Sequence, residues 1–200
     1  MLKVAFSPVA TPDQNTAILT VASGQKLGDQ GVRLDKKLGG AIYRAMEAGS
    51  FTGAKEQTLS IVAPAKSRLS RVILVGIGEP AKATEVMMQR VGGAALAALP
   101  NKETQATLIF DAHKGLGVSL AVAAANAGFG ARLRSYRFDK YRTTLKPEQK
   151  PHLKSFTVSC AEAPKARTAY AALEKVADGV FFTRDLVSEP ANIIYPETLA

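Results

Sequence analysis

Cysteine, tryptophan and long apolar runs are what this 200-residue chain has least of. Its one cysteine, Cys160, excludes a disulfide framework and a cysteine-rich metal site. No apolar run approaches the roughly 20 residues that a membrane-spanning helix needs. The first six residues are too short an apolar run for a secretory signal. We therefore expect a cytoplasmic protein without a membrane partner.

Residues suited to catalysis are also scarce. The two histidines, His113 and His152, lie far apart in lysine-containing stretches, and we expect both to be solvated loop side chains. Cys160 is expected to be a buried structural thiol, because no base can be assigned to activate it. The aspartates are scattered along the chain, as at Asp111, Asp139, Asp178 and Asp185. They do not form the close carboxylate cluster of a two-metal hydrolase, so we predict no catalytic residue, metal ligand or cofactor in this chain.

The overall composition favours a globular fold. The chain is 46% hydrophobic and 22% charged, which is ordinary for a soluble domain with a sizeable core. Its net charge of +9 favours contact with phosphates, whose attraction for cations supplies most of the affinity in non-specific nucleic-acid binding. The absence of tryptophan and an aromatic content of 6% argue against binding by base stacking.

Strand-like and helix-like segments alternate along the chain. Runs rich in apolar or β-branched residues predict strands at 2–6, 16–21, 57–63, 71–76, 106–110 and 155–159. Apolar spacings of three and four residues, or a high alanine content, predict helices at 34–48, 84–99, 118–129 and from 164 onward. The uninterrupted apolar run at 71–76 is typical of a strand covered on both faces. This alternation predicts a three-layer α/β/α fold with a mixed, largely parallel sheet, followed by a connecting helix.

Two pairs of glycines, one inside a predicted helix and one at the end of another, carry expectations about packing. Gly39 and Gly40 lie inside the 34–48 pattern, where each costs about 1 kcal/mol relative to alanine. We expect this pair to permit the close approach of a neighbouring element. Gly128 and Gly130 are expected instead to end the 118–129 helix. Ser119 is expected to lie near the N-terminus of that same helix.

The stretch 76–81, Gly-Ile-Gly-Glu-Pro-Ala, fits the dinucleotide-binding fingerprint and follows a convincing strand. Pro80 lies within the tight phosphate turn, and the only candidate for the ribose-binding acid, Glu103, stands at the wrong register. The other interpretation is a glycine turn that leaves a buried strand. A nucleotide or ADP-ribose binder stays open as an alternative function.

The strongest charge feature is the basic segment at 131–142. Its candidate contact residues are Arg132, Arg134, Arg137, Lys140 and Arg142, interleaved with aromatic side chains. One interpretation is that they contact the phosphates of DNA. The other is a connector whose aromatics pack on the domain while its arginines pair with acids of a partner domain or subunit.

The C-terminal stretch 183–200 predicts a helix end, a connection and a helix start. Ser188-Glu-Pro190 ends the long helix, because a proline disfavours helical geometry in the residue before it. Pro196 stands where a new helix prefers its first residue, with Glu197 near the positive end of the helix dipole. Because a single helical turn is not stable alone, we expect a further domain to follow.

Four stretches, in the same order along the chain, resemble the leucyl (cytosol) aminopeptidase family. The stretch 183–200, with Arg184-Asp-Leu-Val and Glu189-Pro-Ala-Asn, is similar to the start of that family's catalytic domain. The segment 130–142 resembles an inter-element segment of the family, and 34–41 and 74–78 resemble earlier landmarks. Ser188 and Tyr195 depart from the pattern, which has Asn and usually Thr or Ser there.

The resemblance implies a macro-domain-like α/β domain at 1–162, a linker helix at 163–188 and the truncated start of a metallopeptidase domain at 189–200. It implies a parent enzyme with two divalent metal ions, manganese, zinc or magnesium, that removes N-terminal residues from peptides. Family members commonly form homo-oligomers, often hexamers. Their metal ligands and catalytic residues lie beyond Ala200. The resemblance therefore implies an architectural or regulatory chain that is inactive by itself.

Overall fold

A mixed β-sheet forms the centre of the molecule, whose computed structural model describes residues 2–195 and 197, apart from the side chain of Pro147. The strands are β1 (Lys3–Ser7), β2 (Gln14–Ala22), β3 (Lys26–Leu27), β4 (Thr58–Val62), β5 (Arg68–Gly78), β6 (Gln105–Ile109) and β7 (Ser155–Ser159). They lie in the order β1-β7-β6-β2-β5-β4, with β3 paired to β2. In this order, all neighbouring strands from β1 to β5 are parallel. The two antiparallel pairs are β4 with β5 and β3 with β2. The mixed, mostly parallel sheet predicted from the sequence is confirmed.

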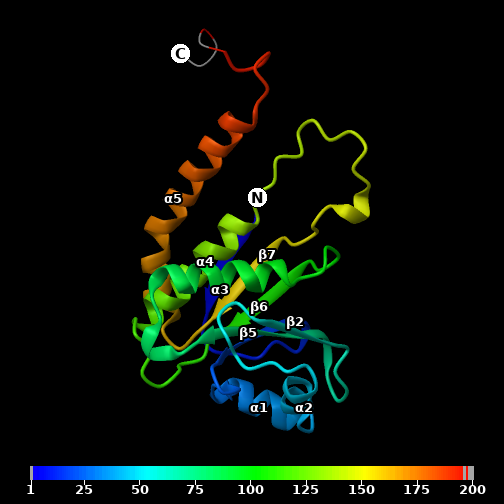
Figure 1. Cartoon of the computed structure of the whole chain (residues 1–200), viewed down its shortest axis with the longest axis vertical. Helices are drawn as coiled ribbons and strands as arrows, with labels where there is room; N and C mark the ends of the chain where they lie inside the picture. Colours follow the sequence, from blue (N-terminus) through cyan, green and yellow to red (C-terminus); the bar gives the residue numbers. More distant parts are fainter. Residues whose placement is uncertain (1, 196, 198–200) are drawn as a thin grey trace.

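Helices cover both faces of this sheet (Figure 1). The α-helices are α1 (Asp29–Lys37), α2 (Ala41–Ala48), α3 (Glu85–Ala97), α4 (Leu120–Arg134) and α5 (Ala163–Ser188), and short 3-10 turns lie at η1 (Pro80–Lys82) and η2 (Pro147–Gln149). Helices α1 and α2 lie on one face, and α3, α4 and α5 on the other. The three-layer α/β/α arrangement is therefore confirmed.

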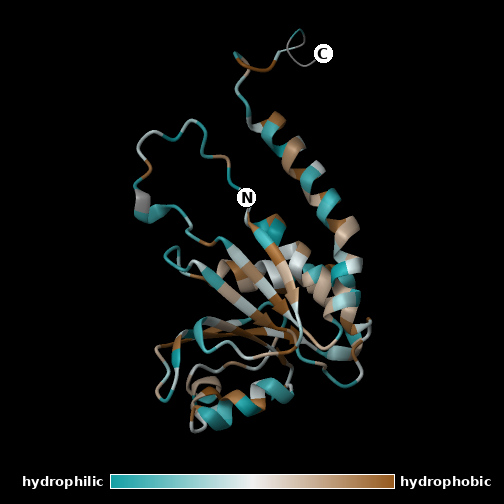
Figure 2. Ribbon diagram, turned by 180° about the vertical axis from the view of Figure 1, so that it is seen from behind, coloured by the Kyte–Doolittle hydropathy of each residue, from teal (hydrophilic) through white to brown (hydrophobic). Residues whose placement is uncertain are grey.

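The core consists of two apolar layers, one on each face of the sheet. Alternate residues of a strand point to opposite faces. Ile18 of β2 and Ile73 of β5 accordingly belong to the cluster under α3, α4 and α5. Their neighbours Leu19 and Leu74 belong to the cluster under α1 and α2. Figure 2 shows the resulting concentration of brown, apolar residues along the strands.

The single helix predicted at 34–48 is wrong, because the structure has two helices there. Gly39 (φ 67°) and Gly40 (φ 77°) adopt the left-handed conformation between α1 and α2. A Cβ on either would meet only the tip of a flexible side chain, Lys66 or Arg44, so this pair does not serve the predicted close approach. Glycine is favoured at such a turn because other residues are strained at positive φ.

The predicted end of a helix at Gly128–Gly130 is also wrong, because α4 continues to Arg134. A Cβ on Gly130 would lie 1.8 Å from the backbone oxygen of Gln89 in α3. A Cβ on Gly92 of α3 would lie equally close, 1.8 Å, to the backbone oxygen of Ala127 in α4. The two helices thus approach each other through glycines, and that packing outweighs the low helix propensity of glycine.

Helix α5 begins on the sheet and then extends beyond it (Figure 1). It packs through Ala163, Ala166, Tyr170, Ala177 and Phe181, which are buried. Its bounds coincide with the predicted linker helix, while the division of the chain into domains stays a prediction. The helix start predicted at Pro196 lies outside the described residues. A search of the part of the chain that the structure describes finds no helix with the length and apolarity to cross a membrane.

Candidate functional site: a basic segment braced against the connecting helix

The five candidate contact residues lie at the end of α4 and in the irregular segment after it. Arg132 and Arg134 belong to the last turn of α4, where cations interact favourably with the helix dipole. Arg137, Lys140 and Arg142 follow in a stretch without regular structure. This stretch runs beside the second half of α5, so the site is formed by two parts of the chain about 45 residues apart.

Arg132 is buried, with 5% of its surface exposed. It donates from Nη1 to Oε1 of Glu174 at 2.7 Å and from Nη2 to Oδ1 of Asp178. Its guanidinium also lies 5.9 Å from the centre of the Phe181 ring. Burial lowers the pKa of Arg132, but the Tyr170 hydroxyl and the two carboxylates outweigh burial and raise that pKa. Arg132 therefore joins α4 to α5 as a permanently charged group.

Tyr136 makes the second connection to α5. Its hydroxyl donates to Oδ1 of Asp185 at 2.8 Å, and its ring packs on that of Phe181 with 5.3 Å between centroids. The guanidinium of Arg184 lies 3.9 Å from the centre of the same ring, a cation–π contact. The aromatic side chain thus packs on the connecting helix α5.

The third connection is made to Glu189, immediately after α5. Lys140 donates from Nζ to Oε1 of Glu189 at 2.6 Å, and the Tyr141 hydroxyl donates to Oε2. The hydrogen bonds from Lys140 and Tyr141 lower the pKa of Glu189. The Lys140 ammonium also lies 5.3 Å from the centre of the Tyr141 ring. Both oxygens of the carboxylate are engaged.

Three of the four acceptors, Glu174, Asp178 and Asp185, belong to α5, and the fourth, Glu189, follows its last residue. Spacings of four and seven residues place the three helical acids on one side of α5. We call the contacts of Arg132, Tyr136, Lys140 and Tyr141 with α5 and Glu189 the brace. The acids that pair with the basic segment come from the connecting helix of the same chain.

The remaining candidate residues are more exposed. Arg137 donates from Nε to Oδ2 of its neighbour Asp139 at 2.8 Å. Within residues 2–195 and 197, the side chains of Arg134 and Arg142 make no ion pair. A role of the five residues in nucleic-acid or interdomain contact stays a prediction, and only Arg134 and Arg142 are left without a charged partner of this kind.

The expectation that His113 is a solvated loop side chain is wrong. His113 is 8% exposed, and its Nε2 lies 3.1 Å from Oγ1 of Thr20 in β2. Burial lowers its pKa to about 4. His152 is exposed, as expected. Cys160 is a buried free thiol, as predicted, and burial raises its pKa.

Asp111 is a structural residue that the sequence did not distinguish from the other acids. It is buried, and its Oδ2 accepts hydrogen bonds from the backbone N–H groups of Gln30 and Gly31, each at 3.1 Å. It caps the N-terminus of α1 from the end of β6. Burial raises its pKa, although the two backbone hydrogen bonds oppose that effect. Its position directly after a buried strand was the available signal.

The loop at 76–81 has a structural explanation for its glycines. A Cβ on Gly76 would lie 1.9 Å from the backbone oxygen of Ala54, and Gly78 has φ 73°. The chain then forms the turn η1, and α3 begins only at Glu85. A dinucleotide site needs the glycine turn to lead directly into a helix N-terminus, so the geometry matches the glycine-turn interpretation.

No group of three or more His, Cys, Asp or Glu side chains among the described residues could hold a metal ion. The fold and the site define an α/β domain from which a braced connecting helix leads away.

The sequence profile of the cytosol aminopeptidase family, N-terminal domain, matches residues 18–145. The chain belongs to this family. It is 41% identical to a probable cytosol aminopeptidase of Caulobacter vibrioides over 202 residues, covering 100% of this chain and 40% of that protein. A probable cytosol aminopeptidase of a Chelativorans species is 38% identical, covering 98% and 39%. The chain thus spans about two fifths of the length of these relatives.

Solved structures share the fold. A mutant of tomato leucine aminopeptidase superposes with a TM-score of 0.79 at 23% identity, covering 100% of this chain and 41% of that one. The bottromycin maturation enzyme BotP, in complex with Mn, gives a TM-score of 0.68 at 21% identity, covering 94% and 34%. At these identities the likeness establishes the fold.

Proposed function

We propose that this chain is the N-terminal, non-catalytic part of a metal-dependent aminopeptidase that removes N-terminal residues from peptides. The observation that carries the proposal is the match of residues 18–145 to the N-terminal domain of the cytosol aminopeptidase family. The name of the relatives, probable cytosol aminopeptidase, supports both the activity and a cytoplasmic location.

The metal chemistry is assigned to the rest of the protein. The family reaction calls for two divalent ions, manganese or zinc, that activate a water molecule and polarise the scissile carbonyl. The described residues of this chain do not fit such a pair, because they contain no cluster of candidate ligands. The complex of BotP with Mn, a protein that shares this fold, supports the assignment of metal ions to the whole enzyme.

The role left to this chain is to carry and orient the connecting helix. The brace fixes α5 against the sheet domain through contacts that extend from Glu174 to Glu189. The assembly proposed for the whole protein is a homo-oligomer, a hexamer by resemblance to the family, with peptides as substrates.

The test compares this 200-residue chain with the protein extended by the sequence that follows it, using leucine amide as substrate. The extended protein should cleave leucine amide with added Mn²⁺, lose this activity when a chelator removes the metal, and regain it when Mn²⁺ is added back. The 200-residue chain should show no cleavage above buffer. Cleavage by the 200-residue chain alone would overturn the assignment of catalysis to the rest of the protein.

A further inference from the structure

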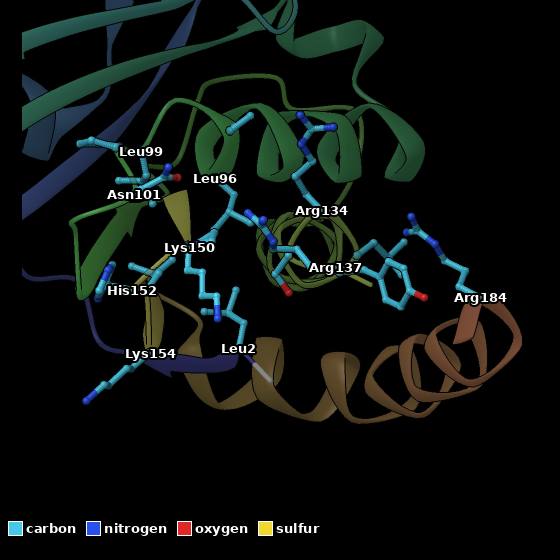
Figure 3. A pocket seen from close by; sticks show the side chains of 17 residues that line it. Leu2, Leu96, Leu99, Asn101, Arg134, Arg137, Lys150, His152, Lys154 and Arg184 are labelled. Atoms are coloured by element: carbon cyan, nitrogen blue, oxygen red, sulfur yellow. The ribbon is translucent and has the colours of Figure 1, made fainter. Parts of the chain in front are cut away.

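A cationic cavity lies next to the brace (Figure 3). Its volume is about 950 Å³, and it lies between the C-terminal ends of α3 and α4, the 150–154 segment before β7, and α5. Ligand pockets in proteins span about 300–1,000 Å³, so the space suits a small organic molecule. It lies at the amino ends of β1 and β7, opposite the edge where open α/β sheets ordinarily bind ligands.

The charge of the lining is of one sign. The cations that line the cavity are Arg134, Arg137, Lys150, Lys154 and Arg184. None of the described residues that line it is acidic. Arg137 is paired with Asp139, but Arg134, Lys150, Lys154 and Arg184 form no ion pair with any residue in the ranges 2–195 and 197. Like charges gathered around one concavity repel each other and attract a multivalent anion.

The walls that carry these charges are held in place. The His152 N–H donates to the Asn101 oxygen at 2.8 Å, and the Lys154 N–H donates to the Thr104 oxygen at 2.9 Å. These bonds fix the 150–154 segment beside the end of α3. In Figure 3, Lys150 and Arg137 extend into the space between the labelled residues, whereas Lys154 points outward. Arg137 and Lys150 are therefore the inner pair of cations.

The cavity also has an apolar wall. Leu2, Leu96 and Leu133 line it from the residue before β1, from α3 and from α4. Leu2 is 7% exposed, and the other two pack against the core. A purely inorganic anion would leave this wall unused. Charge and wall together match a molecule that carries phosphates on a larger, partly apolar body.

We infer that this cavity binds a phosphate-bearing small molecule, of the class of the nucleoside polyphosphates, and that the bound molecule tightens the brace on α5. The coupling follows from shared residues. Tyr136 and Arg184 line the cavity, and they also hold α5 through the cation–π contact and the hydrogen bond to Asp185. The inference concerns regulation and does not depend on the peptidase activity proposed above.

Calorimetric titration of the 200-residue chain with ATP, pyrophosphate and citrate at about physiological ionic strength, ~0.15 M, tests the inference. We expect saturable binding of ATP, with pyrophosphate weaker because it lacks a body to contact the leucines. The double variant Lys150→Glu, Arg137→Gln should raise the dissociation constant of ATP about tenfold or more, because it removes two cationic contacts to the phosphates. Citrate binding as tight as ATP would contradict recognition of phosphate.

A matched control keeps the result specific to the cavity. Lys114→Glu with Arg33→Gln makes the same change in net charge on exposed side chains away from the cavity, and should leave ATP binding unchanged. Hydrogen exchange around residue 184 should slow when ATP is bound to the parent chain, and should not slow in the cavity variant. Absence of ATP binding, equal loss in the control variant, or binding of duplex DNA alone would each overturn the inference.

Discussion

At the scale of single residues, several buried polar side chains have a structural partner. Asp111 caps α1, and Asp35 caps α2 by accepting from the backbone N–H of Ile42 at 2.7 Å. Ser119 accepts from the backbone N–H of Val122 at 3.3 Å and caps α4, as the sequence predicted. His113, in the loop after β6, pairs with Thr20 of β2. Buried polar groups that lacked such partners would cost stability.

The buried ring of His113 gives a prediction about how the stability of the fold depends on pH. The pKa of His113 is about 4 in the folded chain and about 6.5 when unfolded, so folding favours the neutral ring. That contribution is fully present above pH 6.5 and is lost as the pH falls toward 4; it amounts to about 3 kcal/mol at most. Urea unfolding between pH 7 and pH 4.5 should therefore show a smaller loss of stability for His113→Gln than for the parent chain.

The exposed histidine supplies the control for this experiment. His152→Gln should follow the parent chain at every pH, because His152 lies in an exposed loop. Identical pH dependence of the parent chain and His113→Gln would show that His113 can be protonated in the folded chain without cost. Asp111 contributes with the opposite sign, since its raised pKa favours the fold at low pH, and it is common to both proteins.

The burial of individual side chains was the property that the sequence predicted least well. Cys160 was correctly expected to be buried, because it ends an apolar strand. His113 was not, because its neighbours Lys114 and Gly115 suggest a polar loop. The ring is buried because the chain turns back over the end of β2 after β6, and this depends on tertiary packing. Local pattern carries no information about such a contact.

At the scale of elements, the helices α3 and α4 depend on glycine for their close approach. The strand and helix alternation was predictable from periodicity, but the roles of the two glycine pairs were interchanged. Gly39 and Gly40 were expected inside a helix and break it, whereas Gly128 and Gly130 were expected to break a helix and lie inside it. Propensity cannot separate these cases, because the outcome depends on whether another backbone lies against the glycine.

Neighbouring glycines of α3 offer a direct test. Gly92→Ala would place a methyl group 1.8 Å from the backbone oxygen of Ala127, so the helices would have to separate. We expect a loss of about 3 kcal/mol or more in the free energy of unfolding, in the range of severe overpacking. Chemical denaturation monitored by circular dichroism would measure it.

Gly93→Ala is the matched control, one position further along the same helix. Its new methyl group would have no atom closer than 3.8 Å, where contact is ordinary. Replacing a helix-interior glycine by alanine should then stabilise the chain by up to about 1 kcal/mol. A similar loss in both variants would refute the close-approach explanation.

At the scale of the whole molecule, the brace determines how α5 leaves the sheet domain. The spacing of Glu174, Asp178, Asp185 and Glu189 could be read from the sequence, and so could the basic segment. Their pairing could not, because it joins segments about 45 residues apart that meet only after α4 and α5 have packed. The sequence therefore predicted a charged segment and left its partner open.

Removal of the outermost brace contacts should loosen the end of α5. The double variant Lys140→Met, Tyr141→Phe removes both hydrogen-bond donors to Glu189. Both donors are exposed side chains, so the expected loss in the free energy of unfolding is small. Hydrogen exchange in the last two turns of α5 should accelerate several-fold, while exchange in β2 and β5 stays unchanged.

Lys146→Met serves as the control, because Lys146 lies in the same irregular segment and forms no ion pair with the described residues. It should leave the exchange of α5 as in the parent chain. If the double variant also left α5 unchanged, packing of Phe181 and Tyr170 alone would account for the order of the helix.

The pairing of β1 with β7 has a consequence for the way the chain is made. Lys3 lies opposite Ser155, so β1, which is made before the other described strands, finds its partner only when β7, the last of them, has been made. Until β7 emerges, both β1 and the free edge of β6 present unpaired backbone groups that can join another chain. The pace of synthesis between residues 109 and 155, more than the stability of the finished fold, therefore governs how long the nascent protein is open to misassembly.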